Sequence, residues 1–131
     1  MYLLDTNILI YSFNGNPRVR DNFSLNAARP KYISAITYGE LLYGAKKSQR
    51  QTENLAKVYY LKNLCPVLPI DENIIENYST LKAAYAPKGI VLDDADLLIA
   101  ATALAYRFVL VTHNLKHFQK IKELTVEDWA R

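Results

Sequence analysis

With 131 residues, half of them hydrophobic and 22% charged, the chain fits one globular domain over 1–131, and its net charge of +3 permits a nucleic-acid partner without requiring one. The single cysteine, Cys65, excludes an internal disulfide and a multi-cysteine zinc site, and it favours a reducing compartment, the cytoplasm. No apolar run is long enough to cross a membrane, and Asp5 interrupts the N-terminal one, so we expect neither a membrane span nor a signal peptide.

In chain order, short apolar runs alternate with segments whose apolar residues recur at helical spacing. The runs that stop at polar residues predict strands at 1–4, 32–34, 67–70, 108–111 and 125–126. The periodic segments predict helices at 6–13, 17–28, 37–50, 52–63, 71–86, 93–105 and 115–119. In the helix over 52–63 the candidates for the inner surface are Leu55, Val58, Tyr59 and Leu61. Strands that alternate with helices and are apolar on both faces indicate a parallel sheet covered on both sides, an α/β/α domain with a mostly parallel sheet.

In such a sheet, ligands bind outside the carboxyl ends of the strands. Asp5 follows the first predicted strand, and Thr112 and Asn114 follow the fourth. Glu40 lies a turn into the helix after the second strand, and Asp96 lies at the start of the helix over 93–105. The topology therefore gathers several polar side chains at one edge of the sheet.

The densest acidic stretch is Asp93, Asp94 and Asp96, immediately before an apolar helix rich in alanine. That helix has no polar stripe, so we expect it to be buried. Acids in a first helical turn bind free backbone N–H groups and the positive end of the helix dipole. We assign this capping role to Asp93 and Asp94, although Asp94 also suits a water-mediated contact with a metal, and we expect Asp96 to face the sheet edge.

Capping explains each of the other polar residues when it is taken alone. Asp5, Thr6 and Asn114 suit N-caps, and Glu40 has capping-box spacing from Thr37. Capping does not explain why the acids should share one edge, where they would repel one another and raise each other's pKa unless a cation lay among them. Oxygen ligands suit Mg²⁺ or Mn²⁺, and neither histidine has the spacing of a zinc site.

A metal at such a site indicates phosphoryl chemistry, with an activated water and a neutralised phosphate. The chain has no glycine-rich phosphate loop, and Ser34 has no evident base partner for nucleophilic catalysis. A receiver or phosphatase-type phosphoryl-transfer protein is an alternative. Asp5-Thr6-Asn7 lacks the second acid that those proteins need, and Thr112-His113-Asn114 lacks the receiver's lysine.

Four segments together resemble PIN-domain ribonucleases, and most closely the VapC toxins of bacterial toxin–antitoxin pairs. The resemblance runs along essentially the whole chain, and its ending, 124–129, is also similar. The four segments, in order, are Leu4-Asp5-Thr6-Asn7-Ile8-Leu9-Ile10, residues 33–45 around Tyr38-Gly39-Glu40-Leu41, Asp96-Leu97-Leu98-Ile99-Ala100-Ala101, and Val111-Thr112-His113-Asn114-Leu115-Lys116-His117-Phe118.

The resemblance implies a three-layer α/β/α domain of the PIN type and a Mg²⁺- or Mn²⁺-dependent endoribonuclease. Asp5, Glu40 and Asp96 would be its acidic metal ligands, and these three carboxylates should lie together. Asn114 occupies a fourth catalytic position where many PIN domains have aspartate, so we expect one tightly held metal. Thr6 and Thr112 would support the ligands with hydrogen bonds, and the cut would leave 5′-phosphate and 3′-hydroxyl ends.

The resemblance also implies partners: an RNA substrate such as a tRNA or another structured RNA, a second copy of the chain in a homodimer, and a small antitoxin that covers the acidic site. An apolar surface for the antitoxin would include Tyr11, Phe13, Leu41, Leu42 and Tyr43, although Leu41 and Leu42 also suit an ordinary core. RNA phosphates would be held by Lys46, Lys47, Arg50, Lys116 and Lys120, which also suit a solvated face. An alternative is a non-catalytic PIN-like module that acts in an antitoxin–DNA repressor complex.

Overall fold

The computed structural model, which describes residues 1–131, contains one five-stranded sheet in the order β3-β2-β1-β4-β5. All four strand pairings are parallel, as the sequence predicts. The strands are β1 (Tyr2–Leu4), β2 (Lys31–Ser34), β3 (Val67–Leu68), β4 (Val109–Val111) and β5 (Val126–Glu127). Because the strand order reverses between β1 and β4, a crevice for ligands is expected outside the carboxyl ends of these two strands.

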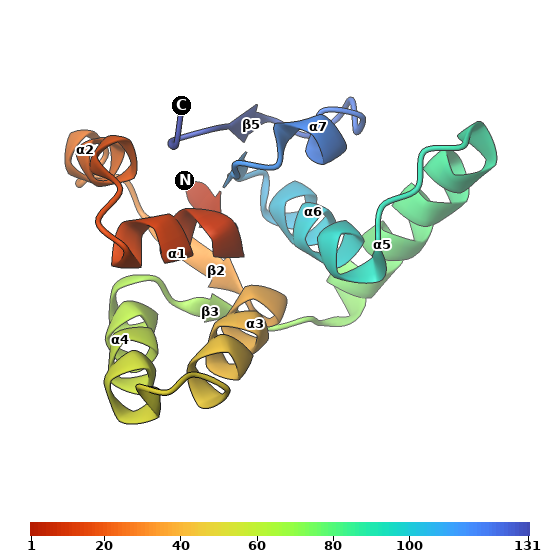
Figure 1. The fold of residues 1–131 in the computed structure, drawn as a ribbon. Helices are drawn as coiled ribbons and strands as arrows, with labels where there is room; N and C mark the ends of the chain where they lie inside the picture. Colours follow the sequence, from red (N-terminus) through yellow and green to blue (C-terminus); the bar gives the residue numbers. More distant parts are fainter.

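Seven α-helices surround the sheet (Figure 1). They are α1 (Thr6–Phe13), α2 (Pro17–Leu25), α3 (Ala35–Lys46), α4 (Gln51–Leu64), α5 (Glu72–Tyr85), α6 (Asp94–Tyr106) and α7 (Leu115–Phe118), with a 3₁₀ turn, η1 (Ala86–Lys88), after α5. None of these helices is both long enough and apolar enough to span a bilayer.

Two hydrophobic cores lie on opposite faces of the sheet, because successive side chains of a strand point to opposite faces. On β1, Tyr2 and Leu4 join a core formed with residues of α1, α2, α3 and α4, and Leu3 joins a core formed with α5 and α6. Figure 1 shows α5 and α6 side by side, away from α1 and α2. This arrangement confirms the three-layer α/β/α prediction.

The helix that follows the acidic stretch is buried, as predicted. In α6 the central residues Ile99, Ala100 and Ala101 are almost completely inaccessible to solvent. The small side chains of the two alanines allow the helix to lie close to the sheet and to α5. A rigid α6 fixes the position of the acids at its first turn.

The start of α3 differs from the prediction. The helix begins at Ala35, where the side chain of Ser34 accepts a hydrogen bond from the backbone N–H of Ile36 (2.9 Å). Thr37 is therefore inside the first turn and buried, and the predicted capping box between Thr37 and Glu40 is wrong. Without that role, the Glu40 side chain is available to interact outside its own helix.

Two smaller predictions about helices are also wrong. Helix α2 ends at Leu25, three residues before the predicted end, where the side chain of Asn26 donates to the Asn22 carbonyl (2.9 Å). Such a side-chain bond competes with continuation of the helix. On α4, Tyr59 was predicted to face inward but is 49% exposed, whereas Val58 and Leu61 are buried.

Candidate active site

Asp5 is the innermost acid of the site. It follows β1 and caps α1, with Oδ1 accepting a hydrogen bond from the backbone N–H of Thr6 (2.8 Å). Its Oδ2 accepts from the hydroxyl of Thr112 (2.8 Å), which in turn accepts from the N–H of Asn114 (2.9 Å). Burial raises the pKa of Asp5, the two hydrogen bonds oppose that rise, and the charges of Glu40 and Asp93 add to it. The carboxylate is therefore firmly oriented but costly to ionise.

Asp96 lies in the first turn of α6, after Asp93 has capped the helix by accepting from the Asp96 N–H (2.8 Å). Its side chain is 22% exposed. Burial, followed by the charges of Asp93, Asp5 and Glu40, raises the pKa of Asp96 to about 6. The effect of Asp5 and Glu40 on this pKa shows that the structure brings the three predicted acids within electrostatic reach of one another.

Glu40 reaches the site from α3, on the exposed side. Its Oε1 accepts a hydrogen bond from the hydroxyl of Thr6 (2.7 Å). Thr6 therefore links the two acids, because its N–H binds Asp5 and its hydroxyl binds Glu40. The predicted supporting positions of Thr6 and Thr112 agree with these bonds.

These acids do not form a ready-made metal cage: no three histidine, cysteine or carboxylate side chains lie close enough together for that. Both oxygens of Asp5 are engaged in hydrogen bonds, and Glu40 is turned toward Thr6. The donor set consists of oxygens that repel one another, which a cation would relieve. It fits Mg²⁺ or Mn²⁺ held by one or two carboxylates with several retained waters.

Asn114 immediately precedes α7. Its side chain makes no capping bond, and Nδ2 lies 2.9 Å from Nδ1 of His117. The same His117 nitrogen is 3.8 Å from Oδ2 of Asp96, and its charge lowers the pKa of Asp96. Sequence reasoning passed over His117, although its spacing of three residues from Asn114 in a helical segment indicates that the two share one face.

Asp93 and Asp94 separate into different roles. Asp93 is the N-cap of α6, as predicted. Asp94 is not a cap: its carboxylate accepts from the Tyr78 hydroxyl (2.7 Å) and the Lys82 ammonium (2.8 Å), both on α5. This exposed interaction lowers the pKa of Asp94, in contrast to the raised pKa of Asp96.

The basic residues proposed for RNA binding form two separate groups, all of them exposed. Lys46 and Lys47 lie at the end of α3, and Lys47 lies over the Tyr43 ring (4.9 Å). Arg50 follows and lies 3.9 Å from Glu53. The second group is Lys116, within α7, and Lys120, two residues after it. Their neighbour His117 lies 3.8 Å from Asp96, which links this second group to the acidic site.

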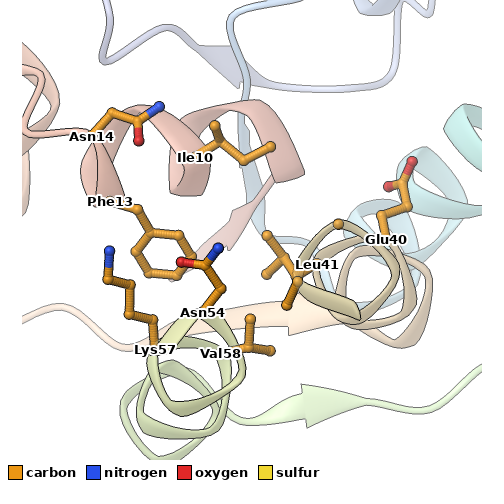
Figure 2. A pocket seen from close by; sticks show the side chains of 10 residues that line it. Ile10, Phe13, Asn14, Glu40, Leu41, Asn54, Lys57 and Val58 are labelled. Carbon is orange, nitrogen blue, oxygen red and sulfur yellow. The ribbon is translucent and has the colours of Figure 1, made fainter. Parts of the chain in front are cut away.

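A groove beside the acids runs between α1, α3 and α4 (Figure 2). Glu40 lies at one end of it, and Phe13 and Leu41 line it with the residues Ile10, Asn14, Gly44, Ala45, Asn54, Lys57 and Val58. Of the predicted antitoxin surface, Tyr11, Leu42 and Tyr43 do not line this groove. The ring of Tyr11 instead contacts His113 (5.4 Å between centroids).

Comparison with known proteins gives a consistent result along the whole chain. The family model described as "PIN domain" matches residues 2–124. A Rickettsia felis protein named Ribonuclease VapC2 is 34% identical over 133 residues, covering 100% of this chain and 99% of the relative. A Salmonella typhimurium protein named tRNA(fMet)-specific endonuclease VapC is 36% identical over 130 residues, covering 98% of each.

Solved structures share the fold. VapBC2 from Rickettsia felis, bound to a DNA fragment from its promoter, superposes with a TM-score of 0.90 at 33% identity and covers 98% of both chains. DNA-bound VapBC from Salmonella typhimurium gives 0.90 at 36% identity, covering 98% of this chain and 97% of that one.

Proposed function

The chain belongs to the PIN-domain family and is similar to its VapC members over its whole length, and on this premise we propose that it is a toxin endoribonuclease that uses a divalent cation and is inhibited by a cognate antitoxin. The observation that carries the proposal is the grouping of Asp5, Glu40 and Asp96 at the carboxyl edge of the sheet, with the pKa of Asp96 raised to about 6 by burial and by its neighbours. Because all three acids are present, we favour a catalytic protein over a non-catalytic module.

The chain's own residues orient the carboxylates. Thr112 and the Thr6 N–H hold the two oxygens of Asp5, and the Thr6 hydroxyl holds Glu40. The negative charges around Asp96 oppose its ionisation, so a bound cation would stabilise its ionised form. When bound, a Mg²⁺ or Mn²⁺ ion would neutralise the scissile phosphate and lower the pKa of an attacking water. In this proposal the side-chain amide of Asn114 and the imidazole of His117 hydrogen-bond to the RNA strand.

The substrate we propose is RNA cut by hydrolysis, leaving 5′-phosphate and 3′-hydroxyl ends. One relative is named a tRNA(fMet)-specific endonuclease, which supports tRNA or another structured RNA as the substrate class. We propose that it acts in the cytoplasm, where such RNA is found. A homodimer remains a further prediction.

For the antitoxin we propose a segment that lies in the groove between α1, α3 and α4. The solved relatives are VapBC complexes, which supports a small partner protein. The groove ends at Glu40, so a segment lying in it reaches the acidic site and blocks it. Ile10 lines the groove and is 44% exposed, so Ile10→Glu should weaken antitoxin binding without loss of RNA cleavage. Ile75→Glu on α5, at 47% exposure, is the matched control.

The direct test is cleavage of RNA by the purified protein. We expect cleavage with Mg²⁺ or Mn²⁺, none with EDTA, and none from Asp5→Asn. Mapping of fragment ends should give 5′-phosphates. Cleavage that persists in Asp5→Asn or in EDTA would contradict the proposed function.

A further inference from the structure

His113 lies at the edge of the candidate site, but none of the roles described so far uses its side chain. It stands between Thr112, which binds Asp5, and Asn114. Its Nδ1 lies 2.9 Å from Oδ2 of Asp128, which follows β5. The pair thus joins the ends of two neighbouring strands, β4 and β5, at the same sheet edge as the acids.

Asp128 fixes both the orientation and the tautomer of this imidazole. Its side chain is only 3% exposed, and its other oxygen accepts from the backbone N–H of Ala130 (2.8 Å). A carboxylate only accepts hydrogen bonds, so Nδ1 of His113 carries the hydrogen. In the neutral imidazole the outer nitrogen, Nε2, is then an acceptor. It has no hydrogen-bond partner within the protein, and the side chain is 43% exposed.

Helix α1 holds the same residue from a second side. The N–H of His113 donates to Oδ1 of Asn7 (3.2 Å), and the Tyr11 ring meets the imidazole edge to face, with 5.4 Å between centroids. Asn7 and Tyr11 are four residues apart and share one face of α1. Since α1 starts directly after Asp5, this face lies beside the site.

Anchoring of the C-terminal residues does not account for this arrangement. Trp129 already anchors them: it is 3% exposed and packs edge to face against Tyr2 (5.1 Å) and Phe23 (5.3 Å). Its carbonyl also accepts a hydrogen bond from Asn22 (3.3 Å). Asp128 also has a cationic neighbour of its own, since Oδ2 lies 3.6 Å from Nε of Arg131. The surface imidazole is therefore not the only partner of this buried carboxylate, and its fixed orientation needs another explanation.

We propose that His113 binds the RNA strand: its Nε2 accepts a hydrogen bond from the nucleotide next to the cleaved phosphodiester, and Asp128 is the positioning residue that holds it. The bound group is a hydrogen-bond donor, either a ribose 2′-hydroxyl or a base N–H. Tyr11 adds an aromatic edge to the same surface. This inference rests on the proposed endoribonuclease function and adds a substrate contact to it.

Two substitutions at one position test the contact. In His113→Asn the amide matches Nδ1 and keeps the bond to Asp128, but the outer nitrogen is lost. In His113→Gln the side-chain amide reaches the position of Nε2, where its Oε1 can accept the same hydrogen bond, and the bond to Asp128 is lost. Both are made in the Asp5→Asn background, which prevents cleavage, and binding of a fluorescein-labelled, mixed-sequence single-stranded RNA is followed by anisotropy.

We expect His113→Asn to weaken RNA binding about tenfold, the loss of one hydrogen bond, and His113→Gln to stay within about threefold. An effect on RNA alone identifies the 2′-hydroxyl as the donor, whereas an equal effect on DNA of the same sequence identifies a base N–H. Fluorescence of Trp129, the only tryptophan, should be unchanged in His113→Asn. Normal binding by His113→Asn together with an altered Trp129 signal in His113→Gln would overturn the proposal and leave a structural role.

A spectroscopic test reads the contact directly. The chain has only two histidines, so a long-range ¹H–¹⁵N spectrum resolves both imidazoles. We expect the Nε2 signal of His113 to move when the RNA is added and to lose that response in Asp128→Asn. An unmoved signal in the presence of bound RNA would overturn the inference alone. Absence of both RNA binding and metal-dependent cleavage by the wild-type chain would overturn the proposed function with it.

Discussion

The first turn of α6 places two aspartates, Asp94 and Asp96, in opposite electrostatic surroundings. Asp94 faces α5, where Lys82 and Tyr78 lower its pKa. Asp96 faces the sheet edge, where burial and the neighbouring acids raise its pKa to about 6. Asp94 and Asp96 thus show that acidic residues two positions apart in the sequence can have opposite pKa shifts, according to the groups that they face. Only the sheet-edge side stores repulsion that a cation would relieve.

The largest expected difference between the two sides is in catalysis. Asp5→Asn should lower the rate of metal-dependent RNA cleavage below detection, by about 10³-fold or more, because the site loses its innermost charge. Asp94→Asn should leave the rate within about twofold of wild type, since its carboxylate faces α5. Single-turnover cleavage of labelled RNA measures both rates. Equal losses in the two variants would remove the distinction.

A matched loss of one hydroxyl on each side sharpens the comparison. Thr112→Val removes the donor to Asp5, which leaves a buried carboxylate oxygen unpaired, so we expect cleavage to fall about 10- to 100-fold. Thr112→Ser should restore most of the rate. Tyr78→Phe removes the donor to Asp94 on the exposed side and should have no effect on cleavage. A normal rate in Thr112→Val would show that Asp5 needs no orientation.

The third prediction concerns stability and its dependence on pH. Because the pKa of Asp96 is raised from 3.8 to about 6, the folded state binds more protons than the unfolded state between these values. The free energy of unfolding should therefore fall as pH rises from about 4 to about 6. Without metal, Asp96→Asn should stabilise the protein near pH 7 by about 1–2 kcal/mol, a gain that disappears near pH 4.

Urea unfolding in EDTA at the two pH values measures this gain. Asp94→Asn is the control, and it should not increase stability at either pH because its carboxylate is paired with Lys82. A lower free energy of unfolding in Asp96→Asn than in the wild type near pH 7 would contradict the claim that repulsion among the acids of the site destabilises the folded protein.

The smallest expected effect is on the salt dependence of RNA binding. Lys116 lies in α7 and Lys120 follows it. Neutralising both should reduce the slope of log affinity against log salt by about 1 to 2. Lys82→Gln, on the α5 side, should leave the slope unchanged. Lys46 and Lys47 lie at the far end of α3 from Glu40, so we expect their effect to be weaker than that of the α7 pair. A flat slope in the wild type would remove the phosphate contacts.

Much of this arrangement could be predicted from the sequence because it depends on local patterns. The abrupt end of an apolar run at Asp5 indicated the β1–α1 junction, and the alanine-rich run after Asp96 indicated a buried helix. Together they placed two acids at one sheet edge. Local pattern also suggested a cap for α3, but both Ser34 and Thr37 are good caps, and only the burial of Thr37 within the fold decides between them.

The remaining features depend on contacts between segments far apart in the chain. Asp94 turns to Lys82 because α5 packs against α6, and His113 meets Asp128 because β4 and β5 are neighbours in the sheet. No spacing in the sequence indicates either pair. Likewise, the absence of a preformed metal cage follows from the hydrogen bonds that orient Asp5 and Glu40.

Binding of Mn²⁺ to the metal-free protein tests the central claim most directly, and the signal of the free ion in electron paramagnetic resonance measures it without any RNA. We expect the wild type and Asp94→Asn to bind Mn²⁺ with equal affinity and Asp96→Asn to bind it about 10- to 100-fold more weakly. Equal Mn²⁺ binding by Asp96→Asn and the wild type, or weakened binding by Asp94→Asn alone, would contradict a cation site at Asp96.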